Sequence, residues 1–251
     1  GYSSAASDVY KRQDERSYLV AEPFEKLGVI NGFSRRLGGV SSGKISGLNF
    51  GFRVGDDSDA VLENYRLLAE DLGFDIRRGV CARQMHTDNI RIVTENDCGK
   101  GIFQQESDIR DTDGLITNQR GIALIIFSAD CVPLLFYDPI KQVVAASHAG
   151  WRGTVLRIAG KTVRILMDEY GADPRLMKAG IAPSIGPEAF EVGEEVVDAF
   201  REAGFEMSCI LKRDADTGKA HIDLWEANRL QLLTEGLSAG NIELAGICTY
   251  A

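Results

Sequence analysis

Apolar and polar positions alternate along most of the chain in patterns that predict short strands and amphipathic helices. Apolar runs bounded by glycine, proline or polar turns predict strands over residues 79–86, 89–93, 114–117, 132–137, 143–147 and 177–182. Residues 123–127 are continuously apolar, which is typical of a strand buried on both faces. Apolar residues at helical spacing predict helices from the turn at Asp57 to Gly73, and over residues 153–170, 192–203 and 224–236.

The order of these elements mixes strands with helices and contains no repeat, low-complexity segment or linker. It favours one mixed α/β (α+β) domain over residues 14–251. Residues 1–13 carry no periodic pattern and join poorly to the rest of the chain. We therefore expect this segment to be non-native or disordered and leave it out of the fold prediction.

Composition narrows the class of protein. The 251 residues carry a formal net charge of -9, which argues against a general nucleic-acid binder. No apolar stretch approaches the ~20 residues of a membrane span, and no signal pattern opens the chain, so no membrane partner is expected. The five cysteines are scattered and odd in number, which indicates reduced thiols in a cytoplasmic protein, used for metal binding or catalysis.

Reactive side chains gather where predicted strands end. The stretches Ser128–Pro133 and Ser147–Gly153 supply Asp130, Cys131, His148 and Arg152, and His86 ends a strand upstream. One thiolate and two imidazoles suit zinc, and three protein ligands leave a fourth position open. His86, Cys131 and His148 are therefore candidate metal ligands, although their wide spacing in the sequence permits a site without requiring one.

The same residues allow other interpretations. Cys131 and His148 could form a thiolate–imidazole pair in a metal-independent cysteine hydrolase or amidase, with Asp130 or another carboxylate orienting the ring. Two hydrogen-bonded histidines and an inert buried cysteine are a further alternative. Arg152 precedes a predicted helix and Arg36 lies beside a Gly-Gly turn, so each could bind phosphate or form a structural ion pair.

Taken together, these motifs resemble the laccase-domain proteins, once called multicopper polyphenol oxidases and now described as purine nucleoside phosphorylases. The matching stretches run in the family's order and are Arg36–Ser41, Asn49–Gly51 with Gly55–Asp57, Asn64–Arg66, Gln84–His86, Asp113 with Ile116–Thr117, Ala129–Pro133, His148–Gly153, Ile185–Pro187 with Phe190–Gly193, and Asp223–Leu224 with Asn228 and Gln231–Leu232. The Ala-Asp-Cys and His-Ala-Gly-Trp-Arg-Gly motifs are the most specific of these.

The resemblance implies a three-layer α/β/α fold with a mixed sheet, and zinc held by His86, Cys131 and His148. It implies phosphorolysis of adenosine, inosine and methylthioadenosine to base and ribose-1-phosphate, with adenosine deamination as a second activity. The partners would be a purine nucleoside and phosphate, and the protein would be a monomer or small homo-oligomer. Copper (Cu²⁺) is the metal of the older family name, but three histidines are too few for a multicopper cluster.

A mechanism that fits these residues gives a hypothesis for their roles. Cys131, His148, Asp130 and Arg152 are expected in catalysis, with Asp130 as the acid or base, and Arg36, Arg152 and Asn49 are expected to contact substrate or phosphate. The alternative functions are the cysteine hydrolase above and a non-catalytic nucleotide-binding partner protein.

This chain departs from the family pattern in three places. Thr87 stands where the family usually has glycine, Glu188-Ala189 replaces a pair that is often cysteine, and the chain stops short of the usual Phe-Ser-Tyr-Arg segment. The last departure predicts a truncated C-terminus.

Overall fold

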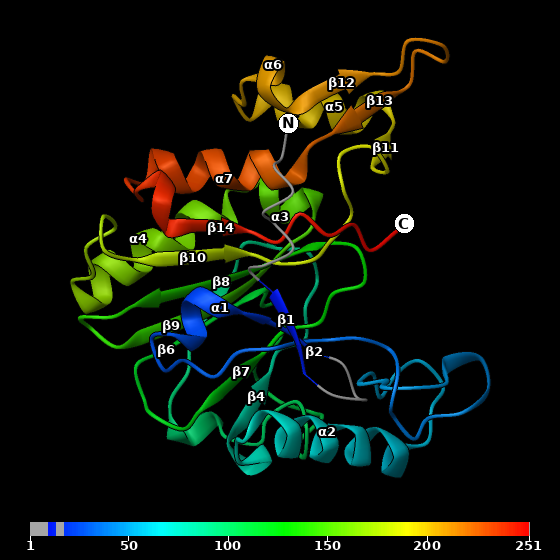
Figure 1. Cartoon of the computed structure of the whole chain (residues 1–251), viewed down its shortest axis with the longest axis vertical. Helices are drawn as coiled ribbons and strands as arrows, with labels where there is room; N and C mark the ends of the chain where they lie inside the picture. Colours follow the sequence, from blue (N-terminus) through cyan, green and yellow to red (C-terminus); the bar gives the residue numbers. More distant parts are fainter. Residues whose placement is uncertain (1–9, 14–17, 251) are drawn as a thin grey trace.

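A mixed sheet lies at the centre of the computed structural model, which describes residues 10–13 and 18–250 (Figure 1). Its six strands follow the order β14-β10-β8-β9-β6-β5. The pairs β10–β14 and β5–β6 are parallel, and the other pairs are antiparallel. The strands are Ile242–Leu244 (β14), Lys178–Ile181 (β10), Val132–Asp138 (β8), Val143–Ala149 (β9), Gly114–Thr117 (β6) and Ile90–Ile92 (β5).

Helices α3 (Trp151–Val155), α4 (Ile158–Tyr170) and α7 (Leu224–Thr234) cover the upper face of this sheet in Figure 1. Their apolar sides and alternate residues of β8, β9 and β10 form the largest core cluster. Its fully buried members include Leu134, Phe136, Ile158, Leu166 and Leu232. Because burying one such side chain contributes about 1.5–3 kcal/mol, this layer is a main source of stability.

Below the sheet in Figure 1 lie helix α2 (Ser58–Leu72) and the parallel two-stranded sheet of β4 (Gly79–Cys81) and β7 (Ala123–Ile125). Helices thus lie on both sides of a mixed sheet, which confirms the predicted α/β fold class. A second small sheet joins the strands before and after α1 (Glu22–Glu25), namely β1 (Tyr10–Gln13), β2 (Tyr18–Ala21) and β3 (Phe33–Ser34). The sequence predicts residues 1–13 to be non-native or disordered. Of these, Tyr10–Gln13 form β1, and residues 1–9 lie outside the described residues.

The remaining elements form a small layer at the top of Figure 1, next to α7. Helices α5 (Glu194–Glu202) and α6 (Met207–Ile210) accompany the sheet β11-β13-β12, which consists of Glu191–Val192, Ala220–Ile222 and Leu211–Arg213. The five cysteines are free thiols, as expected. No helix in the described part of the chain is both long and apolar enough to cross a bilayer.

Three predicted elements differ from the structure. The predicted strand 79–86 ends at Cys81 as β4, and the residues after it form a loop in which His86 has a left-handed backbone (φ 61°) that a strand cannot contain. The apolar run 123–127 contains a strand, β7, but its residues are half-buried, because β7 pairs with β4 alone among the described strands and also borders a cavity. The predicted helix 153–170 is broken into α3 and α4. Arg157 lies between them with a left-handed backbone (φ 66°), a conformation that an α-helix cannot contain.

The loop before α2 is held by a buried asparagine, Asn64. Its amide oxygen accepts a hydrogen bond from the backbone N–H of Val40, and its amide nitrogen donates to the Ser41 hydroxyl and to the carbonyls of Gly47 and Asn49. The carbonyl of Arg36 accepts from the N–H of Leu48 in the same loop. Asn64 therefore fixes the segment from which Arg36 projects.

Replacing Asn64 with alanine should lower the free energy of unfolding by about 1–3 kcal/mol, because buried partners lose their hydrogen bonds. Urea unfolding followed by circular dichroism measures this change. Asn118→Ala, at an exposed position, is the matched control and should stay within about 0.5 kcal/mol of the unsubstituted chain. Equal stability of the two variants would show that the Asn64 contacts contribute nothing to the fold.

Candidate metal centre

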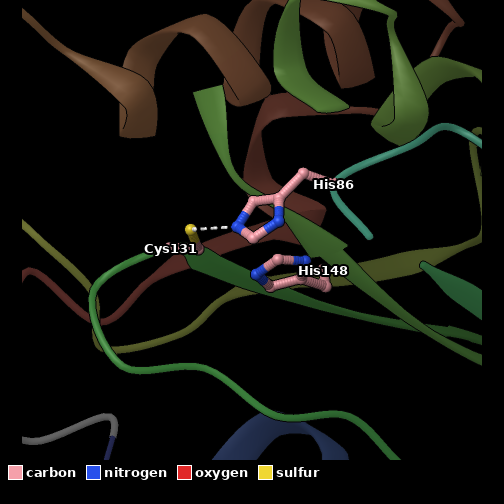
Figure 2. Close-up of side chains that lie close together, drawn as sticks. All are labelled: His86, Cys131 and His148. Atoms are coloured by element: carbon pink, nitrogen blue, oxygen red, sulfur yellow. Dashed lines mark hydrogen bonds between the residues drawn. The ribbon is translucent and has the colours of Figure 1, made fainter. Parts of the chain in front are cut away.

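The three predicted ligands converge at one end of the central sheet (Figure 2). Cys131 immediately precedes β8, and His148 is the penultimate residue of β9, where it pairs with Pro133 of β8. His86 lies in the loop that follows β4. The antiparallel register of β8 and β9 brings the Cys131 thiol and the His148 imidazole to the same end of the sheet.

A glutamine side chain attaches the His86 loop to the loop that leads to Cys131. The amide nitrogen of Gln84 donates to the carbonyl of Phe127 at 2.8 Å, and the Phe127 N–H donates to the Gln84 amide oxygen at 2.7 Å. At the end of that second loop, the Ser128 hydroxyl donates to the Cys131 carbonyl. These contacts explain why two separate loops place a thiol and an imidazole together.

The ligand atoms have a spacing that suits a metal ion. Cys131 Sγ and His86 Nε2 are 3.7 Å apart, and the ligand atoms of all three residues lie within 4.8 Å of one another. The two imidazole rings meet edge to face, with centroids 4.9 Å apart. In a tetrahedral zinc site with ordinary bond lengths, a sulfur and a nitrogen ligand are ~3.6 Å apart. Both the spacing and the donor types therefore fit zinc.

A cavity of about 1460 Å³ adjoins the three ligands. The residues that line it include His86, Cys131 and His148, together with the predicted site residues Asp130, Arg36 and Asn49. His148 is buried, Cys131 is half-buried and His86 is exposed. The group is therefore open to a space large enough for a nucleoside-sized ligand.

Arg36 and Asn49, the two predicted substrate or phosphate contacts from the loop before α2, differ in whether their side-chain donors face the cavity or are already hydrogen-bonded within the loop. Arg36 is exposed at the cavity wall. Both amide hydrogens of Asn49 are used within its own loop, on the carbonyl of Gly51 and the carboxylate of Asp56. Asn49 thus maintains the loop, and a direct contact between Asn49 and substrate stays a prediction.

Arg152 lies outside the cavity lining, although it follows the His148 strand closely. Its guanidinium stacks 4.3 Å from the ring centroid of Trp151, and its positive charge contributes to a lowered pKa at His86. Burial makes the largest contribution to that lowering, and the charge of His148 comes next. Arg152 therefore belongs to the surroundings of the ligands rather than to the wall of the cavity.

His148 is oriented by Asp113 and not by the neighbouring Asp130. Asp130 is exposed and accepts a hydrogen bond from the Thr249 hydroxyl at 2.7 Å, whereas Asp113 Oδ1 lies 2.9 Å from His148 Nδ1. Burial disfavours the charged imidazole, but its hydrogen bonds to Asp113 and Cys131 outweigh burial and raise the pKa of His148 to about 9. Burial likewise opposes ionisation of Asp113, but the hydrogen bonds from His148 and from the Thr87 and Met85 backbone lower its pKa to about 2.

Asp113 and Gln84 lie in stretches that match the family, but the sequence patterns assigned neither residue a role. Asp113 directly precedes the buried strand β6, and a charged residue at the start of an apolar strand is the feature of the sequence that could have marked it as a functional residue. Gln84 had no signal beyond its place in the Gln84–His86 match, because its side chain binds the backbone of a loop that is distant in sequence.

Comparisons with known proteins agree on one family. The family model described as "Multi-copper polyphenol oxidoreductase laccase" matches residues 30–251. A "Purine nucleoside phosphorylase" of Bacteroides thetaiotaomicron is 41% identical over 86% of this chain and 80% of its own. An "Adenosine deaminase RL5" from an unknown prokaryotic organism is 41% identical over 88% of this chain and 84% of its own.

A solved structure has the same fold. The crystal structure of YlmD from Geobacillus stearothermophilus superposes with a TM-score of 0.89 and 37% identity, covering 96% of this chain and 89% of that one. Sequence and fold thus agree over nearly the whole length, and this chain belongs to the multi-copper polyphenol oxidoreductase laccase family.

Proposed function

We propose that this chain is a zinc-dependent purine nucleoside phosphorylase that acts on adenosine, inosine and methylthioadenosine and also deaminates adenosine. The observation that carries the proposal is the His86, Cys131 and His148 group, which opens onto a large cavity. The names of relatives at 36–41% identity, purine nucleoside phosphorylase and adenosine deaminase, support both activities. Asp130, Arg36 and Arg152 are proposed as the other functional residues.

Zinc suits the donor set better than copper does. A thiolate and two imidazoles are ordinary zinc ligands, and multicopper oxidases need several additional histidines. Within the described residues, His221 lies on β13, away from the group that meets metal-site geometry. Zinc with an open fourth position supplies Lewis acidity, which activates water or polarises a substrate atom.

Phosphorolysis requires two events at the ribose. A phosphate oxygen forms a bond to C1′ while the bond between C1′ and the base nitrogen breaks, and a proton neutralises the departing base. Arg36 is well placed to hold the phosphate dianion at the cavity wall, because a guanidinium binds phosphate oxygens in pairs. Asp130, exposed at the cavity next to Cys131, is the candidate that moves the proton.

A metal-independent cysteine hydrolase is the rival function. Cys131 lies near both imidazoles, and Asp113 orients His148, so the parts of a nucleophile–base–carboxylate arrangement are present. The His86 imidazole favours a metal site instead. A cysteine–histidine dyad needs only one imidazole, whereas His86 places a second ring nitrogen 3.7 Å from the Cys131 sulfur.

Product analysis after incubation with adenosine tests the proposal. Adenine that forms only with added phosphate reports phosphorolysis, and inosine that forms without phosphate reports deamination. We expect both products, about one zinc per chain, and loss of both activities after chelation with recovery on adding zinc. A metal-free chain that is acylated at Cys131 by ester substrates would support the hydrolase, and a chain that binds adenosine without turnover would support the binding protein.

The affinity for zinc should rise with pH between 6 and 8. His148 has a pKa of about 9 without metal, so its ring carries a proton in this range and must lose it to bind a metal. Each proton that a ligand releases on binding makes the affinity rise about tenfold per pH unit, so the His148 proton sets a minimum slope and a Cys131 thiol that ionises on binding steepens it. Asp113, with a pKa of about 2, stays ionised throughout and adds nothing to the slope.

Competition with a coloured chelator at pH 6, 7 and 8 measures this slope. The His221→Gln variant is the matched control, since it removes a histidine outside the site and should keep the same slope. An affinity that is constant across these pH values would mean that His148 is not a ligand.

A further inference from the structure

Asp113 contacts the loop that carries one of the proposed ligands. It is 1% exposed, and its carboxylate accepts hydrogen bonds from three consecutive backbone N–H groups. These come from Met85 at 3.1 Å, His86 at 3.0 Å and Thr87 at 2.8 Å. The middle residue, His86, has a left-handed backbone with φ of 61°. A residue with a side chain persists in this conformation only where its surroundings impose it, and this carboxylate supplies such surroundings.

The same carboxylate contacts the second imidazole ligand. Asp113 Oδ1 lies 2.9 Å from His148 Nδ1, and the backbone carbonyl of Asp113 accepts from the His148 N–H at 2.7 Å. With Nδ1 bound to the carboxylate, Nε2 is the ring nitrogen left to face the other ligands. One buried side chain therefore governs the ring orientation of His148 and the backbone position of His86.

Thr87 adds a contact that its usual counterpart, glycine, could not make. Its hydroxyl lies 2.9 Å from Asp113 Oδ2 and 3.0 Å from the carbonyl of Asp111. The single hydroxyl hydrogen is donated to one of these two oxygens at a time, so the Thr87 side chain links the His86 loop either to the Asp113 carboxylate or to the backbone of Asp111.

We propose that Asp113 is a positioning residue that fixes His86 and His148 for divalent metal binding and sets the affinity of the site. This inference rests on the metal site of the proposed function. It concerns a residue that touches neither metal nor substrate and acts through two ligands at once. Carboxylates that hold ligand histidines affect metal affinity by about 10–100-fold in known sites.

Zinc affinity of the metal-depleted chain and its variants, measured by chelator competition, tests the proposal. We expect Asp113→Asn to weaken zinc binding by about 10–100-fold, because an amide cannot accept all of these hydrogen bonds. Asp111→Asn is the matched control two residues away, at an exposed side chain, and should stay within about twofold. The absorption bands of bound Co²⁺ should change in Asp113→Asn and not in the control.

An Asp113→Asn variant with unchanged zinc affinity and an unchanged Co²⁺ spectrum would overturn this inference and leave the metal site standing. A native chain that binds no zinc would overturn both. A further measurement avoids the question of whether the variant folds. Nitrogen-15 spectra of the zinc-loaded native chain should show His148 protonated at Nδ1, and protonation at Nε2 would contradict the role assigned to Asp113.

Discussion

Replacing Cys131 with alanine is expected to remove bound zinc and to lower phosphorolysis and deamination about a thousand-fold. Lewis-acid stabilisation contributes several kcal/mol to a transition state, and each 1.4 kcal/mol is a factor of ten in rate. Alanine leaves two imidazoles, of which only His148 is buried and held by a carboxylate. His86 lies on an exposed loop and loses its sulfur neighbour at 3.7 Å.

The matched control for this substitution is Cys209→Ala. Cys209 is exposed on α6 and lies outside the ligand group, so zinc content and both rates should remain unchanged. Metal content and product formation are measured on the same preparations. Loss of activity in Cys131→Ala would not by itself separate a ligand from a nucleophile, because both interpretations predict it.

Metal content separates the two interpretations. If Cys131 is a ligand, the native chain holds zinc, chelation removes activity, and bound zinc protects Cys131 from iodoacetamide. If it is a nucleophile, chelation leaves activity intact and alkylation of Cys131 is equally fast with and without zinc. The second pattern would refute the zinc-dependent function proposed here.

The candidate ligand residues could be picked out from the sequence because their signal is local. Cys131 and His148 each lie at the end of an apolar run, and residue type alone narrows the metals that such a set can bind. Their mutual distance could not be predicted, because it depends on the register of β8 against β9 and on the Gln84 contact with Phe127. Those interactions join residues that are distant in sequence.

The contact between Asp113 and His148 could not be predicted for a similar reason. This residue precedes β6, which lies beside β9 in the sheet, and the pairing of Gly114 with Ser147 places Asp113 next to His148. Sequence order gives no information on that neighbour. The misread strand β7 shows the same limit, since an apolar run indicates burial but not whether a second strand or a cavity lies beside it.

Substitution of Gly150 with alanine is expected to weaken zinc binding and lower turnover about a hundred-fold while the fold stays intact. Gly150 lies between the His148 strand and helix α3 with φ of -65° and ψ of 172°, a conformation that alanine adopts freely. Alanine therefore introduces no backbone strain at this position, and any loss of zinc affinity or turnover arises from contacts of the added methyl group with neighbouring side chains.

A methyl group at this position would meet two of the proposed ligands. Its carbon would lie 2.8 Å from Cδ2 of the His86 ring and 2.9 Å from Sγ of Cys131, well inside normal contact distance. Both side chains would have to move by several tenths of an ångström or more, and in directions that alter the distance between nitrogen and sulfur. Displacements near 1 Å in a reacting site cost about a hundred-fold in rate.

Gly240→Ala is the matched control, because no atom lies within 4 Å of the added methyl carbon there. Both variants should unfold within a few degrees of the native chain, whereas zinc affinity and nucleoside turnover should fall in Gly150→Ala alone. This result would localise the function to the space between His86 and Cys131 without removing any functional group. Full zinc affinity and full turnover in Gly150→Ala would mean that these two side chains do not act together on a metal, and the proposed centre would have to be abandoned.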